Sequence, residues 1–277
     1  MSDSTVNPPK DILSSNAVEE EDEGNLYNLF VCEDYVEKSW TFGDLVQPLL
    51  CSNMSSTEYD LTGQIVWPAC VLLSWFVYQN KDLFDGKIVL ELGAGCGLGG
   101  FVAAHYAKKC IITDGNDIVC NLLEKNKVHL KTEHVQVSKL LWGIQDEISG
   151  SVGDDLSQSP DVIIGADVIL WPNQIHALLN TIRWLLARKR DNAVCYISYI
   201  VRAHTTTERL FLTAERLGLS IELQPIESFV PAEVHDFDTL EKKLLCIKIK
   251  AGVTEEELLL NVADDLTDQM DTLSRPC

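Results

Sequence analysis

Residues 87–100 read KIVLELGAGCGLGG, a short apolar run that ends in closely spaced glycines. The run at 87–92 predicts a buried strand, and the residues from Leu98 onward predict a helix. Glycines between a strand and a helix permit a tight turn and let backbone N–H groups approach a ligand closely. This strand, loop and helix therefore predict the ligand-binding end of an α/β sheet.

The alternation of strands and helices continues on both sides of this loop. A helix is predicted before it at 67–79, with Pro68 in the first turn, where a missing N–H costs little. Further strands are predicted at 110–113, from 135, at 161–166, 193–198, 219–223 and 244–249, and further helices at 98–108, 118–128, 174–187 and 206–217. Short apolar strands without alternation are typical of a sheet covered on both faces. The predicted fold class is therefore α/β, a doubly wound and mostly parallel sheet.

Charge divides the chain into parts. It has 42 acidic and 22 basic side chains, a formal net charge of -20, and 46% hydrophobic residues. The hydrophobic fraction excludes disorder throughout, and the charge disfavours binding to nucleic acid or a membrane surface. Residues 1–45 carry a net charge of -9 and residues 251–277 carry -6. We expect a disordered acidic arm at 1–24 that recruits a basic partner, a cover segment with a small hairpin at 25–62, a main domain at 63–250 and an acidic tail at 251–277.

Cysteine usage and hydropathy indicate the compartment. The nine cysteines contain no C-x-x-C pair and the six histidines are scattered, so no metal site is predicted. The cysteines are interpreted as reduced thiols of an intracellular protein. The N-terminus lacks a basic-then-apolar leader, and the most apolar stretch, 66–78, contains Pro68 and is shorter than the ~20 residues of a membrane span. We expect a soluble monomer in the cytoplasm, with the nucleus as a second location.

The ligand of the glycine loop is ambiguous from the loop alone. Asp114 ends the second predicted strand, 21 residues after Gly93, where it can accept hydrogen bonds from ribose hydroxyls. Residues 95–100 also satisfy the dinucleotide pattern G-x-G-x-x-G. Glu91 favours another ligand, because a carboxylate there would crowd a pyrophosphate but is compatible with the cationic sulfonium and amino group of S-adenosylmethionine.

Five short blocks in order resemble methyltransferase family 16 of the seven-strand, Rossmann-like S-adenosylmethionine-dependent methyltransferases. The blocks are residues 66–69 (VWPA), 91–98 (ELGAGCGL), 113–114 (TD), 141–143 (LWG) and 165–169 (GADVI). The resemblance spans about 63–249 and makes that part the methyltransferase domain. It implies that the cofactor S-adenosylmethionine is bound by eight residues, with Asp114 holding the ribose and Trp142 flanking the adenine. They are Trp67, Glu91, Gly93, Ala94, Gly95, Asp114, Trp142 and Ala166.

The resemblance also implies where the methyl acceptor binds. The family carries Asp-x-x-Tyr or Asp-x-x-Phe after the fourth strand; this chain keeps Asp167 but has Leu170 at the aromatic position and Trp171 next to it. We expect Asp167 to orient the incoming nitrogen, and Trp171 with Tyr199 to form aromatic walls that tolerate a cation. Asp167 as a simple turn cap is the structural alternative.

The implied activity is methyl transfer to a lysine side chain of a protein substrate. Best-known family members act on proteins, so the partner classes considered are a basic protein, a chaperone, a translation factor or a histone. Residues 198–203 and 226–229 are similar to the branch of the family that methylates histone arginine, which keeps arginine as the alternative acceptor. A catalytically silent adaptor is a further alternative. A nicotinamide-dependent oxidoreductase is disfavoured because no Tyr-x-x-x-Lys relay accompanies the loop.

Overall fold

The centre of the protein is a seven-stranded sheet in the order β5-β4-β3-β6-β7-β9-β8. The computed structural model describes residues 35–53, 62–143, 159–189, 192–231, 241–254 and 257–258. The sheet strands are β3 (Ile88–Leu92), β4 (Lys109–Asp114), β5 (Val135–Lys139), β6 (Val162–Ala166), β7 (Val194–Ile200), β8 (Leu219–Gln224) and β9 (Lys242–Ile249). β9 pairs antiparallel with β7 on one side and with β8 on the other, and the remaining neighbouring strands pair parallel. The predicted α/β class with a mostly parallel seven-stranded sheet is confirmed.

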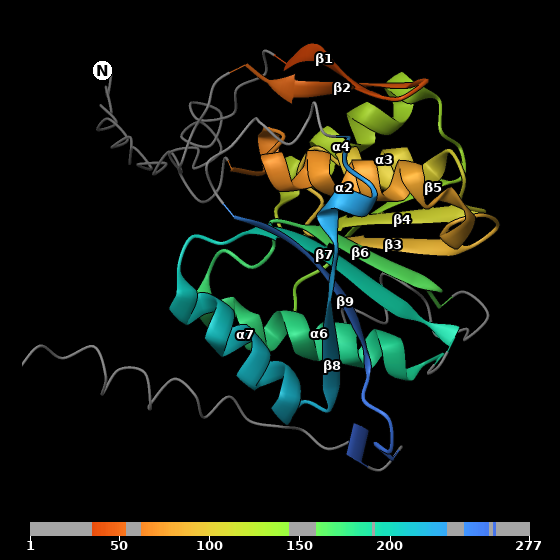
Figure 1. The fold of residues 1–277 in the computed structure, drawn as a ribbon. Coiled ribbons are helices and arrows are strands. Elements are labelled where there is room, and N and C mark those ends of the chain that lie inside the picture. The colour runs from red at the N-terminus through yellow and green to blue at the C-terminus, as the bar shows by residue number, and fades with distance from the viewer. Residues whose placement is uncertain are drawn as a thin grey trace, which may run out of the picture. The chain divides into compact units, whose positions relative to one another are not determined.

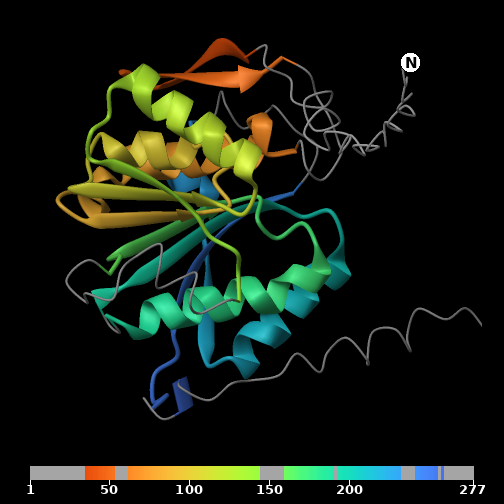
Figure 2. The ribbon, with the colours of Figure 1, turned by 180° about the vertical axis from the view of Figure 1, so that it is seen from behind.

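Helices cover both faces of this sheet (Figures 1 and 2). One face carries α2 (Pro68–Gln79), α3 (Leu98–Ala104) and α4 (Asp117–Leu130). The other face carries α6 (Ile175–Ala187) and α7 (His204–Arg216). The described residues also contain four short 3₁₀ turns: η1 (Thr62–Gln64), η2 (Lys81–Leu83), η4 (Pro172–Gln174) and η6 (Ile226–Ser228).

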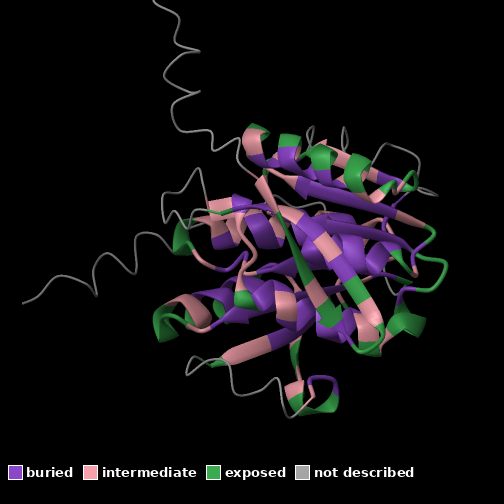
Figure 3. Ribbon diagram, turned by 90° about the horizontal axis from the view of Figure 1, so that it is seen from above, coloured by how far each residue is buried: buried purple, intermediate pink, exposed green. Residues whose placement is uncertain are grey.

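Burial explains why the strands are continuous apolar runs. Every residue of β3 and β6 is buried, because each strand has helices on both sides. Two core clusters result, one between the sheet and α2, α3 and α4, and one between the sheet and α6 and α7. In Figure 3 the central strands are buried along most of their length, and exposed residues lie on the outer helix surfaces and turns.

The sheet topology places a ligand crevice at β3. From β3 the chain runs outward to β4 and β5 on one side, whereas β6 and β7 lie on the other side. In open α/β sheets, ligands bind beyond the carboxyl ends of the strands at such a switch point. The residues after β3, β4, β6 and β7 therefore meet at one edge of the sheet, and they include most of the residues expected to bind cofactor or acceptor.

A separate two-stranded hairpin lies outside the α2–α4 layer (Figure 1). It consists of β1 (Tyr35–Phe42) and β2 (Leu45–Ser52), joined by a turn in which Gly43 has φ of 59°. Phe42, Leu49 and Cys51 of the hairpin belong to the core cluster on that face. The hairpin expected within 25–62 is therefore present at 35–52, and it completes the apolar cover of α2, α3 and α4.

Asn126 of α4 ties this hairpin to the glycine loop. Its Oδ1 accepts from the Leu50 N–H at 2.7 Å, and its Nδ2 donates to the carbonyl oxygens of Leu50 at 3.0 Å and Cys96 at 3.3 Å. The side chain is fully buried. A single buried amide therefore satisfies backbone groups of β2 and of the loop.

We expect Asn126→Ala to lower the free energy of unfolding by about 2–4 kcal/mol, because buried backbone groups lose their partners. Urea unfolding measures this loss. Asn121→Ala, at an exposed position of the same helix, is the matched control and should change stability by less than about 0.5 kcal/mol. Equal effects of the two substitutions would show that the Asn126 bridge contributes nothing specific.

Two local predictions need correction. The helix predicted at 98–108 ends at Ala104. The strand predicted from 135 ends at Lys139, so Trp142 lies in a turn. At the end of α6, Arg188 donates to Ser159 Oγ at 2.7 Å and Lys189 pairs with Asp161 at 2.7 Å. The acidic arm at 1–24 and most of the tail at 251–277 lie outside the described residues. No helix in the described part of the chain is long and apolar enough to cross a membrane.

Candidate active site

The glycine loop, residues 93–97, has the left-handed backbone that its glycines predict. Gly93, Gly95 and Gly97 have φ of 59°, 55° and 84°, values that non-glycine residues rarely adopt. A Cβ atom on Gly93 would lie 2.7 Å from Val168 Cγ1 and 3.0 Å from Trp142 Cζ2. The bare backbone at Gly93 is therefore packed directly against the Trp142 ring and Val168, closer than a side chain on residue 93 would allow.

Asp114, the last residue of β4, is bonded to this loop. Its Oδ2 accepts from the Gly95 N–H at 3.1 Å and its Oδ1 accepts from the Asn116 N–H at 3.0 Å. Burial raises the pKa of this carboxyl, and the N–H groups of Asn116, Gly95 and Gly115 oppose that rise. Each carboxylate oxygen has more than one lone pair, so both can still accept from a ligand hydroxyl. Asp114 is thus fixed beside the glycine loop at the end of β4, and its contact with a ribose remains a prediction.

The remaining predicted cofactor residues border the same edge. Ala94 is buried and donates its N–H to the Thr113 carbonyl at 2.9 Å, which joins the loop to β4. Ala166 is the last residue of β6 and is buried. Trp67 immediately precedes α2, and its indole Nε1 donates to the Thr62 carbonyl at 2.9 Å. Trp142 is half-buried beside Gly93.

Glu91 points away from the crevice and toward the first turn of α3. The residue is 2% exposed, and its Oε2 accepts from the Gly100 N–H at 2.9 Å. Cβ atoms on Gly99 or Gly100 would collide with this carboxyl group, so these two glycines make room for it. Burial raises the Glu91 pKa to about 8. Its contact with the sulfonium remains a prediction, while its observed partner is the start of α3.

The raised pKa of Glu91 predicts a pH-dependent stability. The unfolded chain releases the Glu91 proton near pH 4.5 and the folded chain near pH 8, so stability falls across this window. Glu91→Gln removes the titration and can keep the bond from Gly100. We expect the variant to gain stability relative to the wild type between pH 5 and pH 8, by at most about 1.4 kcal/mol per pH unit. Urea unfolding at several pH values tests this, and a pH-independent difference would contradict it.

Asp167 follows β6, has a positive φ and forms an ion pair with Arg202. Its φ is 58°, and its N–H donates to the Ser198 carbonyl at 2.8 Å. Arg202 donates from Nη1 to Oδ1 at 2.7 Å and from Nη2 to Oδ2 at 2.6 Å. The same guanidinium lies 5.9 Å from the centre of the Trp67 ring. Asp167 is therefore more than a turn cap, because it belongs to a group of three side chains that also includes Arg202 and Trp67.

Arg202 is the site residue that the sequence interpretation missed. It lies within residues 198–203, which carried the similarity to the arginine-methylating branch, but the sequence offers no sign that Arg202 pairs with Asp167. The pairing follows from the parallel register of β6 and β7, which sets Ala166 beside Ser198 and so brings the residues after both strands together.

The two expected aromatic walls differ in their positions. Trp171 immediately precedes η4 and is 43% exposed, so its ring is accessible and its role stays a prediction. Tyr199 is 1% exposed and packs in the core between the sheet and α6 and α7, with its hydroxyl 3.5 Å from Thr207 Oγ1. Tyr199 as an aromatic wall is therefore wrong, because alternation along β7 turns it away from α2.

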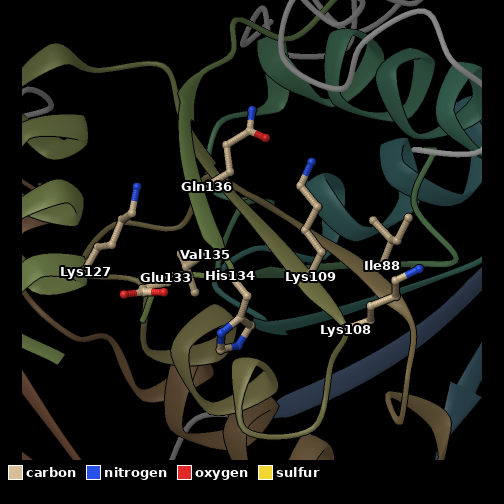
Figure 4. Close-up of a pocket in the computed structure, with 8 residues that line it drawn as sticks. All are labelled: Ile88, Lys108, Lys109, Lys127, Glu133, His134, Val135 and Gln136. Atoms are coloured by element: carbon tan, nitrogen blue, oxygen red, sulfur yellow. The ribbon is translucent and has the colours of Figure 1, made fainter. Parts of the chain in front are cut away.

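The site at the carboxyl ends is distinct from a hollow of about 530 Å³ elsewhere on the surface. That hollow is lined by Ile88, Lys108, Lys109, Lys127, Glu133, His134, Val135 and Gln136 (Figure 4). Ile88, Lys109 and Val135 are the first residues of their strands, so the hollow lies at the amino edge of the sheet. Within the described ranges, no three His, Cys, Asp or Glu side chains are grouped to hold a metal ion.

Comparison with known proteins identifies the family of this site. A family model described as lysine methyltransferase matches residues 52–216, more than half of the chain. The chain belongs to the lysine methyltransferase family. The matched range contains the glycine loop, Asp114, Asp167 and Arg202, so the lysine methyltransferase match covers both halves of the candidate site.

Relatives within the lysine methyltransferase family fall into two acceptor classes. The chain is 27% identical over 204 residues to human protein-lysine N-methyltransferase EEF2KMT, covering 67% of this chain and 60% of that protein. It is 31% identical over 182 residues to zebrafish (Danio rerio) protein N-lysine methyltransferase METTL21A, covering 65% and 78%. It is 32% identical over 175 residues to rat (Rattus norvegicus) histone-arginine methyltransferase METTL23, covering 60% and 72%. The match thus spans less than two thirds of the human EEF2KMT chain.

Solved structures agree with the fold. A T. thermophilus 16S rRNA methyltransferase, solved with AdoMet and guanosine, has a TM-score of 0.51 and 15% identity, and covers 78% of this chain and 50% of that one. At this identity the likeness concerns the arrangement of strands and helices alone. It supports a Rossmann-like methyltransferase sheet for this lysine methyltransferase family member.

Proposed function

We propose that this protein transfers a methyl group from S-adenosylmethionine to a lysine side-chain nitrogen of a protein substrate. The observation that carries the proposal is the meeting of the glycine loop, Asp114 and Asp167 at the carboxyl ends of β3, β4 and β6 in a member of the lysine methyltransferase family. Relatives named for lysine methylation of proteins support a protein acceptor.

The residues of the crevice fit the cofactor. The backbone of Gly93 lies directly against Trp142 and Val168 because it carries no side chain, and Asp114 has lone pairs for ribose hydroxyls. Trp142 beside Gly93 offers a flat surface for an adenine, and Trp67 and Ala166 border the space toward the acceptor. Among the described residues expected to bind the cofactor, Glu91 and Asp114 are acidic and none is basic, which agrees with a ligand that carries a sulfonium.

The bound cofactor supplies an electrophilic methyl carbon: the acceptor lone pair forms the N–C bond while the C–S bond breaks and leaves its electron pair on sulfur. The protein has to present a nitrogen that has already lost its proton, align it and exclude water. Asp167 is placed to accept a hydrogen bond from that nitrogen, and the accessible Trp171 ring can contact the acceptor stem. The single proton released overall is the one that the lysine ammonium loses before attack, and the product leaves as a methylammonium ion.

An arginine acceptor is the second candidate. It is favoured by relatives named as histone-arginine methyltransferases, which are 29% to 35% identical to this chain. Arginine keeps its proton at physiological pH, so this reaction would need a base that removes a guanidinium proton. Among the carboxylates of the site, Asp167 is the one expected beside the acceptor, and it is committed to Arg202. This arrangement favours lysine.

Transfer of label to protein tests the proposal. Purified protein is incubated with S-adenosylmethionine labelled in its methyl group and a dialysed extract of cells that lack the protein. We expect label in a discrete protein band that is absent when Asp167→Asn replaces the wild type. Label in nucleic acid would contradict the proposal of a protein acceptor. Binding of S-adenosylhomocysteine without any transfer would contradict the proposal and favour a silent adaptor.

A further inference from the structure

The guanidinium of Arg202 forms an ion pair with both oxygens of the Asp167 carboxylate. Both carboxylate oxygens are engaged, each by a different nitrogen, at 2.7 and 2.6 Å. A two-pronged contact of this kind fixes the plane of the carboxylate as well as its position. Three segments meet here, because Asp167 follows β6, Arg202 follows β7 and Trp67 precedes α2.

The two members of the pair differ in burial. The Asp167 side chain is 7% exposed and the Arg202 side chain is 32% exposed, so the acid lies inside and the cation covers it. Without Arg202, the buried carboxylate would need another cation, since an unpaired buried charge is costly. The hydrogen bonds that Arg202 donates to Asp167 raise the pKa of Arg202, which therefore stays charged across the whole range in which lysine titrates.

This balance has a consequence for an amine that approaches Asp167. Beside an uncompensated carboxylate, a lysine is held as the ammonium ion, and its pKa rises. An ammonium has no lone pair and cannot accept a methyl group. Beside a carboxylate that Arg202 already neutralises, the nearby guanidinium disfavours a second positive charge, and the neutral amine binds through a hydrogen bond instead.

Building on the proposed function, we propose that Arg202 sets the protonation state of the methyl acceptor: by compensating Asp167, it makes the site bind a neutral amine. The proton leaves the lysine to solvent on entry to the site, before the N–C bond forms. Arg202 is accordingly a positioning and specificity residue. A variant that lacks Arg202 should bind the acceptor more tightly and methylate it more slowly.

Other titratable groups near the pair are accounted for. On α2, the Cys70 thiol is buried, and burial together with Glu91 and Asp167 raises its pKa to about 12, so it is neutral at physiological pH. At the start of α7, His204 is exposed and lies two residues from Arg202, so it serves as a control position. The charged groups on the remaining neighbours are Glu91 of β3, Glu241, which precedes β9 and pairs with Lys243, and Lys242 of β9.

The test is the pH dependence of a single turnover in Arg202→Gln. Enzyme and labelled S-adenosylmethionine are in excess over the acceptor in the dialysed extract, and first-order rate constants are measured from pH 6 to 10. We expect the ascending limb of the profile to move up by about one pH unit or more, with about 10-fold slower transfer at pH 7. The enzyme concentration for half-maximal rate should fall.

Three further variants make the outcome decisive. Arg202→Lys keeps the charge and should keep the wild-type limb. The double variant Asp167→Asn with Arg202→Gln removes both charges, can fold without a buried unpaired acid, and should return the limb to the wild-type position at a lower rate. His204→Gln should leave the limb unchanged, which excludes histidine titration as the source.

Two results would overturn the inference. One is an ascending limb of the rate–pH profile that does not move in Arg202→Gln, and the other is an ascending limb that stays displaced in the double variant. Weaker acceptor binding together with weaker S-adenosylhomocysteine binding in Arg202→Lys would also overturn it, because a purely structural role predicts that pattern. The proposed function is judged separately by the wild type in the same experiment. If the wild type labels no lysine, the proposed function fails; if it does and the limb is insensitive to Arg202, only the inference fails.

Discussion

Asp114→Ala is expected to weaken binding of S-adenosylhomocysteine by about 100-fold or more. The carboxylate is the group placed to accept hydrogen bonds from ribose hydroxyls, and each bond to a charged acceptor contributes about 1.5–3 kcal/mol. Two such bonds correspond to at least about 3 kcal/mol, or two powers of ten in the dissociation constant. The substitution also frees the Gly95 N–H, so the glycine loop loses an anchor.

Isothermal calorimetry of the purified variants measures this effect. Asp117→Ala is the matched control, since Asp117 lies three residues further along, is exposed and forms only a surface pair with Lys139. We expect the control to bind S-adenosylhomocysteine like the wild type. NAD should bind to neither protein. Unchanged affinity in Asp114→Ala would remove the cofactor site from the carboxyl end of β4.

Asp167→Asn is expected to slow methyl transfer by about 100-fold while cofactor binding is unchanged. Asparagine tolerates the positive φ of 58° at this position, so the backbone is preserved and only the charge and acceptor strength change. The loss reflects the missing carboxylate that orients the acceptor nitrogen, because misplacing a reacting group can slow a reaction about 100-fold.

Labelled transfer under saturating cofactor and calorimetry with S-adenosylhomocysteine separate the two properties. Asp167→Ala should be slower still and less stable, because alanine does not favour this backbone conformation. Activity of Asp167→Asn within a few-fold of the wild type would assign the residue a structural role that depends on its bond to Ser198 and not on its charge.

The sheet was predictable because its strands are buried on both faces. Apolar runs without alternation, such as residues 88–90 and 162–164, are what this environment requires, so the sequence pattern locates them. The glycine loop was predictable for a different reason: three glycines with positive φ leave a pattern that other residues rarely satisfy. The positions of Gly93, Gly95 and Asp114 followed from that loop and from the end of the next strand.

Contacts between distant segments were not predictable. Asp167 and Arg202 are 35 residues apart, and their pairing depends on the order and register of β6 and β7. Asn126 was unremarked within an amphipathic helix, yet it joins the hairpin and the glycine loop. Glu91 was interpreted by its charge, whereas the alternation of side chains along β3 turns it toward α3. In each case the deciding factor is which face of an element a polar side chain occupies.

The most direct test of the account is to identify the methylated atom. Wild-type protein, deuterated S-adenosylmethionine and the dialysed extract are incubated together, and the labelled protein is digested and sequenced by mass spectrometry. The account predicts a deuterated methyl group on a lysine side chain at a defined position, lost in Asp167→Asn. A label on arginine, or no labelled residue in a protein that binds S-adenosylhomocysteine, would contradict it.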